Sequence, residues 1–267
     1  MSKFGFIGTG NMGGALARAV AKSVGCENVI VSDKNTESAQ LLADELNCRS
    51  ANTEEVITNA KFLFLGVKPQ VLPDVIKEIS SALAKRSDRF VLVTMAAGVA
   101  LTKFDEMFGT QYPIIRIMPN TPVQKGKGMI QYCANSAVQT DELTEFCDSL
   151  KFAGRVDNLQ ENLIDAASAV SGCGPAFAYL FAEALADAGV ECGLPRNKAI
   201  EYASQMLSGA AELLLTTGKH PGVLKDEVCS PGGTTIAGLH ALETNGFRGA
   251  VMSAVKAAYD KTKALSK

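Results

Sequence analysis

A loop of small and hydroxyl-bearing residues near the carboxyl end of the chain has the composition of an anion-binding site. It reads Ser230-Pro231-Gly232-Gly233-Thr234-Thr235, and apolar residues at helical spacing follow it, which predicts a tight loop that begins a helix. The first N–H groups of a helix have no partner within it and carry the positive end of its dipole. We therefore predict that a carboxylate binds these amides, with threonine hydroxyls beside it; the alternative is an ordinary capped helix start.

A second glycine-rich loop lies at the amino end. An apolar run, Phe4–Ile7, precedes Gly8-Thr9-Gly10-Asn11-Met12-Gly13, and apolar residues at helical spacing follow. Strand, turn and helix in this order are the context in which G-x-G-x-x-G binds a dinucleotide. The first glycine allows the tight turn, the second lets a pyrophosphate approach, and the third lets the helix pack against the strand. We predict a dinucleotide site here rather than a purely structural turn.

The end of the second predicted strand, residues 28–32, bears on the choice between NADH and NADPH. Asp33 follows it, and an acidic residue there accepts a hydrogen bond from the ribose 2′-hydroxyl and repels a 2′-phosphate, which favours NADH. Lys34, with Ser32 and Asn35 beside it, offers a cation and polar donors that could hold the phosphate instead. The sequence leaves both cofactors open.

Three further apolar runs, residues 61–67, 89–94 and 113–118, are typical of strands buried in a parallel sheet. Ligands of such sheets lie beyond the carboxyl ends of the strands. We expect Lys68 to face the cofactor, small residues 96–98 to leave room for the nucleotide, and Asn120 to be held in the cleft between two prolines. The alternatives are a solvated loop lysine and an ordinary turn.

From about residue 160 onward the pattern is helical and rich in alanine. We predict an α/β plus all-α protein, with a Rossmann-type dinucleotide-binding domain over residues 1–157 and an all-helical domain over residues 158–267. Long helices bury little of their own apolar surface, so the helical domain is expected to bind a second copy as a homodimer or larger homo-oligomer. Helices are predicted over residues 163–170, 176–190, 195–215, 236–242 and 247–265, with a kink at Ser171-Gly172-Cys173-Gly174-Pro175.

Composition narrows the classes of partner. The 267 residues are 47% hydrophobic and 20% charged with a net charge of −2, so no basic excess calls for nucleic acid. The seven cysteines are scattered and never spaced as Cys-x-x-Cys, which argues against a disulfide framework or a metal site. We see no signal-peptide pattern and no apolar run long enough to cross a bilayer, and we expect a cytoplasmic protein without membrane partners.

Motifs along nearly the whole chain resemble those of one known family. They are residues 6–13, Val67-Lys68-Pro69, Ala96-Ala97-Gly98, Arg116-Ile117-Met118-Pro119-Asn120-Thr121-Pro122, residues 171–177, His220-Pro221-Gly222 and residues 228–239. The family that they resemble is pyrroline-5-carboxylate reductase. The resemblance implies NAD(P)H-dependent reduction of the C=N bond of 1-pyrroline-5-carboxylate to L-proline, the last step of proline biosynthesis. The chain departs from the family at Gly218, where some members carry an acidic residue.

The patterns and the resemblance together give a candidate site. Substrate is expected at Gly233, Thr234, Thr235, Asn120 and Ser171, with the Thr235 hydroxyl as the catalytic group that reaches the ring nitrogen. The family implies pyrophosphate contacts at residues 7–12, adenosine-side contacts at Ser32 and Asn52, and nicotinamide contacts at residues 66–69 and 96–98. The expected cofactor-binding residues are Ile7, Gly8, Thr9, Gly10, Asn11, Met12, Ser32, Asp33, Lys34, Asn52, Gly66, Val67, Lys68, Pro69, Ala96, Ala97 and Gly98.

Two other functions fit parts of the pattern. A β-hydroxyacid-type dehydrogenase would need a catalytic lysine on the first long helix of the helical domain, and residues 160–192 contain no lysine. A non-catalytic dinucleotide-binding regulator would have no use for the loop at residues 230–235. A turnover assay separates this second alternative from an enzyme.

Overall fold

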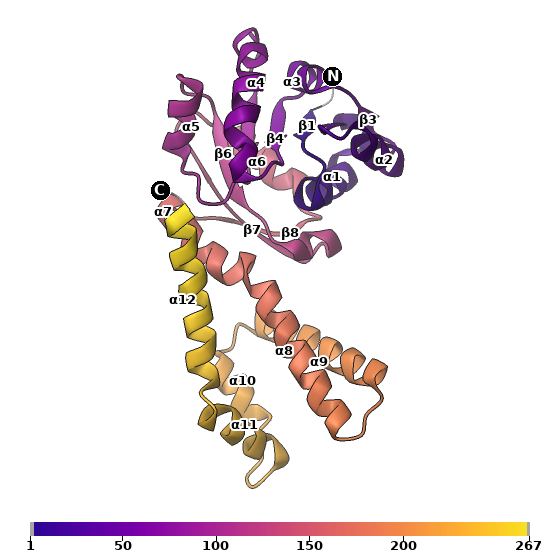
Figure 1. The fold of residues 1–267 in the computed structure, drawn as a ribbon, viewed down its shortest axis with the longest axis vertical. Coiled ribbons are helices and arrows are strands. Elements are labelled where there is room, and N and C mark those ends of the chain that lie inside the picture. Colours follow the sequence, from indigo (N-terminus) through magenta and orange to yellow (C-terminus); the bar gives the residue numbers. More distant parts are fainter. Residues whose placement is uncertain (1–2, 266–267) are drawn as a thin grey trace. The chain divides into compact units, whose positions relative to one another are not determined.

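The structure, a computed structural model, describes residues 3–265 of the chain. Two compact units are present. The first ends at Cys173 and takes up the chain again from Ala258, and the second is Gly174–Ala257. Figure 1 colours both units along the sequence.

A mostly parallel sheet is the centre of the first unit. Its order is β3-β2-β1-β4-β5-β6-β7-β8, and each neighbouring pair is parallel except β6 with β7. The strand order reverses at β1, so β2 and β3 lie on one side of it and β4 to β8 on the other. The strands are β1 Phe4–Ile7, β2 Val29–Ser32, β3 Arg49–Ser50, β4 Phe62–Leu65, β5 Val91–Thr94, β6 Ile114–Met118, β7 Gly128–Ala134 and β8 Gly154–Asn158.

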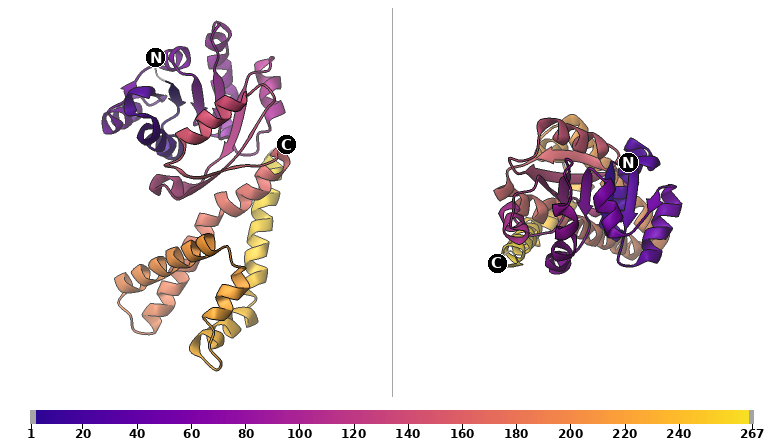
Figure 2. Two further views of the ribbon diagram at one scale, coloured as in Figure 1. Left: turned by 180° about the vertical axis from the view of Figure 1, so that it is seen from behind. Right: turned by 90° about the horizontal axis from the view of Figure 1, so that it is seen from above.

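Helices cover both faces of this sheet (Figure 2), because alternate strand residues point to opposite faces. On one face, side chains of α1, α2 and α6 pack against Phe4, Phe6, Phe62 and Phe64. On the other face, α3, α4, α5 and α7 pack against residues such as Leu63 and Leu65. These helices are α1 Asn11–Val24, α2 Thr36–Leu46, α3 Thr53–Asn59, α4 Leu72–Ala84, α5 Leu101–Phe108, α6 Thr140–Ser149 and α7 Glu161–Ala167, with short turns η1 Cys26–Asn28, η2 Pro69–Val71 and η3 Thr121–Lys125.

Paired phenylalanines fix the register of β1 against β4. Phe4 lies opposite Phe62 and Phe6 opposite Phe64. Their rings stack with centroids 5.1 Å and 4.5 Å apart. Since such pairs add about 0.5–1.5 kcal/mol beyond burial, a slip of β1 would be disfavoured. This register places the ends of β1 and β4 side by side.

The second unit is helical, as predicted, and buries little of itself. Among its described residues only Ala186, Ala199 and Ala203 are buried, whereas large apolar side chains such as Tyr179 and Leu180 are 65% and 67% exposed. Helices α8 and α9 form a hairpin (Figures 1 and 2). The helices are α8 Gly174–Glu191, α9 Arg196–Thr217, α10 Pro221–Glu227, α11 Thr234–Thr244 and α12 Phe247–Leu265, whose last residues belong to the first unit.

At the predicted kink, residues 171–175, the helix continues through an unusual turn. The chain passes from α7 through the π-helical turn η4, Ser168–Gly172, into α8. The helical stretch Glu161–Glu191 has 31 residues and a mean hydropathy of 1.3 over its most apolar 18-residue window. By length and composition alone it could cross a membrane, which corrects the expectation that no apolar run is long enough. The π turn lets the chain accommodate Pro175 while the helix continues into α8.

The two compact units divide at Cys173, whereas the predicted domain boundary lies at 157/158. Helix α7 follows that predicted boundary, packs on β7, and pairs its Asp165 with Arg116 of β6. In the second unit the His220 side chain caps α10 by accepting from the Gly222 N–H.

Candidate active site

The predicted cofactor residues follow parallel strands and so reach one edge of the sheet. The glycine loop follows β1, Asp33 follows β2, Asn52 follows β3, Lys68 follows β4 and Gly98 follows β5. Because these five strands are parallel neighbours, their carboxyl ends lie together. The reversal of strand order at β1 places the glycine loop at the point where open sheets of this kind bind ligands.

Three glycines bring the loops after β1 and β4 into backbone contact. A Cβ on Gly13 would lie 2.1 Å from the Gly8 carbonyl oxygen, and a Cβ on Gly66 would lie 2.6 Å from the same atom. Gly8 itself has a φ of +101°, which side chains disfavour. The helix α1 can therefore begin directly against the sheet edge.

Gly10 has a different surrounding from these three glycines. Nothing lies within 4 Å of the position that its Cβ would occupy. It precedes α1, and in the described chain no side chain caps this helix and no acidic residue stands in its first turn. The amides that begin α1 are thus open to an anion, as a pyrophosphate requires. These features fit the dinucleotide.

Asp33 is bound to the glycine loop. Its Oδ2 accepts from the Thr9 backbone N–H at 2.6 Å and from the Thr9 hydroxyl at 3.0 Å, and its Oδ1 accepts from the Asn35 N–H at 2.9 Å. Lys34 is exposed beside it. Ser32 is only 1% exposed, and its hydroxyl lies 3.5 Å from the Phe6 carbonyl oxygen, so its expected contact with the adenosine side stays a prediction.

Asn52 and Asp33 line the same pocket, of about 470 Å³. The Asn52 Oδ1 accepts from the Glu55 N–H at 2.8 Å and so caps α3. Thr36 and Gln40 of α2 complete one wall of this pocket. The structure therefore brings together two of the residues expected on the adenosine side.

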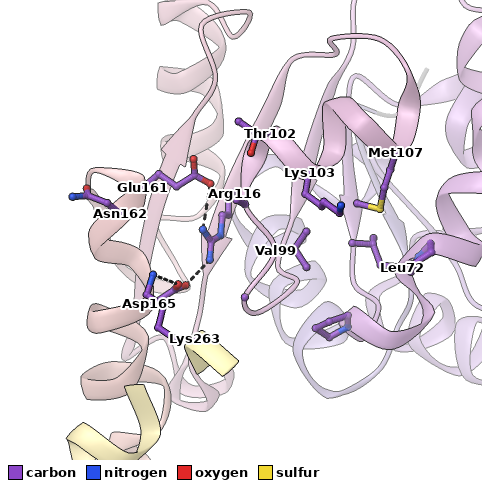
Figure 3. A pocket seen from close by; sticks show the side chains of 14 residues that line it. Leu72, Val99, Thr102, Lys103, Met107, Arg116, Glu161, Asn162, Asp165 and Lys263 are labelled. Carbon is purple, nitrogen blue, oxygen red and sulfur yellow. Dashed lines mark hydrogen bonds and ion pairs between the residues drawn. The ribbon is translucent and has the colours of Figure 1, made fainter. Parts of the chain in front are cut away.

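A larger pocket, of about 820 Å³, lies against the residues expected at the nicotinamide half. Pro69 and Gly98 line it, with Leu72, Val99 and Met107 as apolar neighbours (Figure 3). Gly98 has a φ of +75° in the turn after β5. Lys68 is exposed next to Pro69, and Ala96 is buried while Ala97 is exposed.

Charged residues that sequence reasoning missed form one wall of this pocket. The Arg116 guanidinium lies between Glu161 (3.3 Å) and Asp165 (2.7 Å), and Lys263 contacts Asp165 at 3.1 Å (Figure 3). Arg116 is 2% exposed, and its Nε has no hydrogen-bond partner among the described residues. Cys133 of β7 lies opposite Arg116. Burial, and to a lesser extent the Glu161 charge, raise the pKa of the Cys133 thiol to about 11, so this thiol is neutral at pH 7.

A signal for this cluster exists in the sequence. Arg116 interrupts an apolar strand, Ile114–Met118, in which every residue is buried. A buried arginine needs acceptors, because an unpaired charge in a core is costly. That pattern identifies Arg116, but its partners Glu161 and Asp165 come from α7 and have no local signature.

Asn120 and Ser171, both expected to bind substrate, are joined to each other by a hydrogen bond within the first unit. The Asn120 Nδ2 donates to the Ser171 carbonyl at 2.9 Å, and its Oδ1 accepts from the Met129 N–H at 2.9 Å. The Ser171 hydroxyl lies 2.9 Å from Gln131 Nε2 and 2.9 Å from the Ala167 carbonyl. The structure thus joins these two residues, and their expected contact with substrate stays a prediction.

The predicted substrate loop lies in the second unit, where it precedes α11. Residues 230–233 form a turn in which the Gly233 N–H donates to the Ser230 carbonyl at 3.0 Å, and Gly232 has a φ of +70°. The turn therefore uses the Gly233 amide, and the expected contact of Gly233 with a carboxylate stays a prediction. A Cβ on Gly233 would lie 2.6 Å from Ser230 Oγ, so the turn requires a glycine there.

Thr234 and Thr235 present the open donors of this loop. They are the first two residues of α11, which no side chain caps in the described structure. Both threonines are exposed, and within residues 3–265 neither hydroxyl has a hydrogen-bond partner. Gly233 and Ile236 line a pocket of about 580 Å³ with Lys225. Two adjacent amides, two hydroxyls and a cation are groups that can hold a carboxylate.

Comparisons with known proteins agree with both units. A family model described as pyrroline-5-carboxylate reductase dimerisation matches residues 161–265. A second model, described as NADP oxidoreductase, coenzyme F420-dependent, matches residues 3–98. Together they cover the glycine loop at the amino end and the loop before α11.

Full-length relatives decide the family. The pyrroline-5-carboxylate reductase of Escherichia coli (strain K12) is 38% identical over 99% of this chain and 98% of its own length. That of Synechocystis is 41% identical over the same shares. A pyrroline carboxylate reductase structure from Plasmodium falciparum with NADP bound has a TM-score of 0.86, 34% identity, and coverage of 100% of this chain and 98% of its own. The chain belongs to the pyrroline-5-carboxylate reductase family.

Membership of the pyrroline-5-carboxylate reductase family confirms the predicted fold class and the predicted NAD(P)H-dependent activity. A β-hydroxyacid-type dehydrogenase and a non-catalytic regulator are both disfavoured by it. The helical part, residues 161–265, is a dimerisation domain of this family.

Proposed function

We propose that this reductase holds 1-pyrroline-5-carboxylate at the loop before α11 and NAD(P)H at the sheet edge of the first unit. The observation that carries the proposal is a pair of threonines, Thr234 and Thr235, whose hydroxyls have no partner among the described residues and which begin a helix that no described side chain caps. The substrate carboxylate accepts from their backbone amides, with the helix dipole behind them. NAD(P)H supplies the hydride together with its electron pair.

Thr235 is proposed to orient the reacting bond. Its hydroxyl contacts the ring nitrogen while the amides hold the carboxylate, so two points fix the plane of the ring. The C=N carbon accepts the hydride, the C=N π electrons pass to nitrogen, and the product is L-proline. The iminium form is the better acceptor, and its proton comes from solvent or arrives with the substrate.

In the proposed cofactor site, backbone groups make more of the contacts than side chains do. The open amides at Gly10 and α1 hold the pyrophosphate, and the pocket shared by Asp33 and Asn52 takes the adenosine side. The pocket at Pro69 and Gly98 takes the nicotinamide half. The exposed Lys34 leaves both NADPH and NADH as cofactors.

Exposed apolar surface supports a homo-oligomer. Tyr179 and Leu180 of α8 and Met252 of α12 are more than 60% exposed, and such surface is normally covered. We propose that a second copy covers it, that the enzyme is cytoplasmic, and that nucleic acid and membranes are not partners. Light scattering of the purified protein without detergent should give at least a dimer, whereas recovery only with lipid would contradict this.

The test of the proposed site compares two threonines of one helix. Thr235→Ala should lower kcat/KM for 1-pyrroline-5-carboxylate about ten- to a thousandfold with NAD(P)H affinity unchanged. Thr244→Ala is the matched control, because the Thr244 hydroxyl bonds only to the His240 carbonyl within α11. Oxidation of NADPH and NADH with proline formation is the measurement. Wild-type turnover by Thr235→Ala would remove this residue from the mechanism.

A further inference from the structure

Pro175 leaves a carbonyl group without its helical donor. In an α-helix the N–H of residue 175 would bond to the carbonyl of residue 171, and proline has no N–H. The chain responds with a π turn, in which the Cys173 N–H donates to the Ser168 carbonyl at 3.1 Å. The carbonyl left over is that of Ser171.

Asn120 supplies the missing donor from a distant part of the chain. Its Nδ2 donates to the Ser171 carbonyl at 2.9 Å, while its Oδ1 accepts from the Met129 N–H at 2.9 Å. Asn120 is 9% exposed, so an amide largely shielded from water joins β7 to the π turn. Gln131, 4% exposed on the same strand β7, pairs with the Ser171 hydroxyl as a second tie.

The bonds from Asn120 and Gln131 to Ser171 lie next to the point where the first unit ends. The first unit ends at Cys173, and α8 begins the second unit at Gly174. The proposed cofactor residues belong to the first unit and the substrate loop to the second. Hydride transfer demands that donor and acceptor carbons be held closely, and a displacement of about 1 Å can cost a hundredfold in rate.

We propose that Asn120 is a positioning residue for hydride transfer, which acts by holding the π turn through the Ser171 carbonyl that Pro175 leaves free. The inference rests on the proposed function, but it assigns Asn120 no contact with substrate or cofactor. Unusual helical turns of this kind occur often at functional sites. These bonds hold the π turn, the last residues of the first unit before α8, against strand β7.

The discriminating variant is Asn120→Asp. Aspartate keeps an acceptor for the Met129 N–H but places an oxygen against the Ser171 carbonyl. We expect kcat to fall about ten- to a hundredfold with the Kd of NADPH unchanged. Asn135→Asp is the matched control, because Asn135 also bridges two backbone groups, the Ile114 N–H and the Tyr112 carbonyl, at the other end of the β6–β7 pair. It should leave kcat near the wild-type value.

A double-mutant cycle with Pro175→Ala tests the cause. Alanine restores the N–H of residue 175, so the Ser171 carbonyl no longer depends on Asn120. The loss of kcat caused by Asn120→Asp should then be smaller in the Pro175→Ala background, and the same coupling should appear in urea unfolding, which needs no activity. Equal losses in both backgrounds would overturn the proposal, as would a rise in KM for substrate alone. An inactive wild-type enzyme would instead refute the proposed function.

Discussion

The carboxylate of Asp33 binds Thr9 at two points, the backbone N–H at 2.6 Å and the hydroxyl at 3.0 Å. The end of β2 therefore supports the glycine loop after β1. An acidic residue at this position is usually considered for its contact with the ribose 2′-hydroxyl. In this chain the Asp33 carboxylate also holds the glycine loop in place.

Asp33→Ala should weaken the binding of both NADH and NADPH. Loss of the charged hydrogen bonds to Thr9 frees the loop, so the Kd values of NADH and NADPH should each rise about tenfold. Binding is followed by the fluorescence of the reduced cofactor. If NADPH instead binds more tightly while NADH binds more weakly, Asp33 acts mainly by repelling the 2′-phosphate.

Alanine at two glycines of one loop should affect different properties, cofactor binding at Gly10 and stability at Gly13. At Gly10 the added Cβ meets nothing within 4 Å, so Gly10→Ala should keep the fold but obstruct the pyrophosphate and raise the Kd of the cofactor about tenfold or more. At Gly13 the Cβ would lie 2.1 Å from the Gly8 carbonyl oxygen, so Gly13→Ala should lower the melting temperature. Thermal unfolding and cofactor titration of both variants check this. Equal stability losses would contradict it.

The two cations beside Asp165 should contribute differently to stability. Arg116 is buried, and Arg116→Met leaves the 6% exposed Asp165 with only Lys263, at a cost of about 3 kcal/mol. The Lys263 side chain is 46% exposed, so Lys263→Met should cost less than about 1 kcal/mol. Urea unfolding gives both values. A loss of similar size in the two variants would show that burial does not set the strength of this cluster.

Glu142 should contribute to stability in a pH-dependent way. Burial alone would raise its pKa, but the Arg89 guanidinium, at 2.8 Å from both carboxylate oxygens, and the Gln139 N–H outweigh this and hold the pKa below its usual range. A lowered carboxyl pKa stabilises the fold above the unfolded value of about 4.3 and loses that effect as pH falls through the folded value. Glu142→Gln should therefore be less stable at pH 7 and lose less stability on acidification.

Urea unfolding of the wild type and Glu142→Gln at pH 7 and below about pH 4 makes this comparison. The difference between the two proteins isolates Glu142 from the other carboxylates, such as Asp88, whose pKa is lowered by its bond to Arg86. Parallel curves at all pH values would mean that Glu142 contributes nothing to acid unfolding.

Sequence alone predicted the features that depend on neighbours along the chain. The order of strand, glycine turn and helix at residues 4–24 follows from local apolar spacing. The loop before α11 follows from Pro231 and its glycines, which a helix excludes. Parallel strands then require that Gly8, Asp33 and Gly98 share one edge, and the structure confirms that edge.

Local pattern could not give the contacts that depend on distant residues. Pro175 predicts a kink, and the structure has a π turn there, where the Ser171 carbonyl accepts from the amide of Asn120. The Ser32 hydroxyl lies 3.5 Å from the Phe6 carbonyl oxygen of the neighbouring strand, a contact that only the pairing of β1 with β2 creates.

By itself the sequence determined the fold class, the family and the two loops that carry the proposed chemistry, because these depend on residue types at short spacing. Only the tertiary structure decided that Asn120 holds Ser171, 51 positions away, and that Asp165 pairs with both Arg116 and Lys263. The physical reason is that hydrogen bonds and ion pairs depend on distances in space, which residues far apart in sequence acquire only when the sheet brings their elements together.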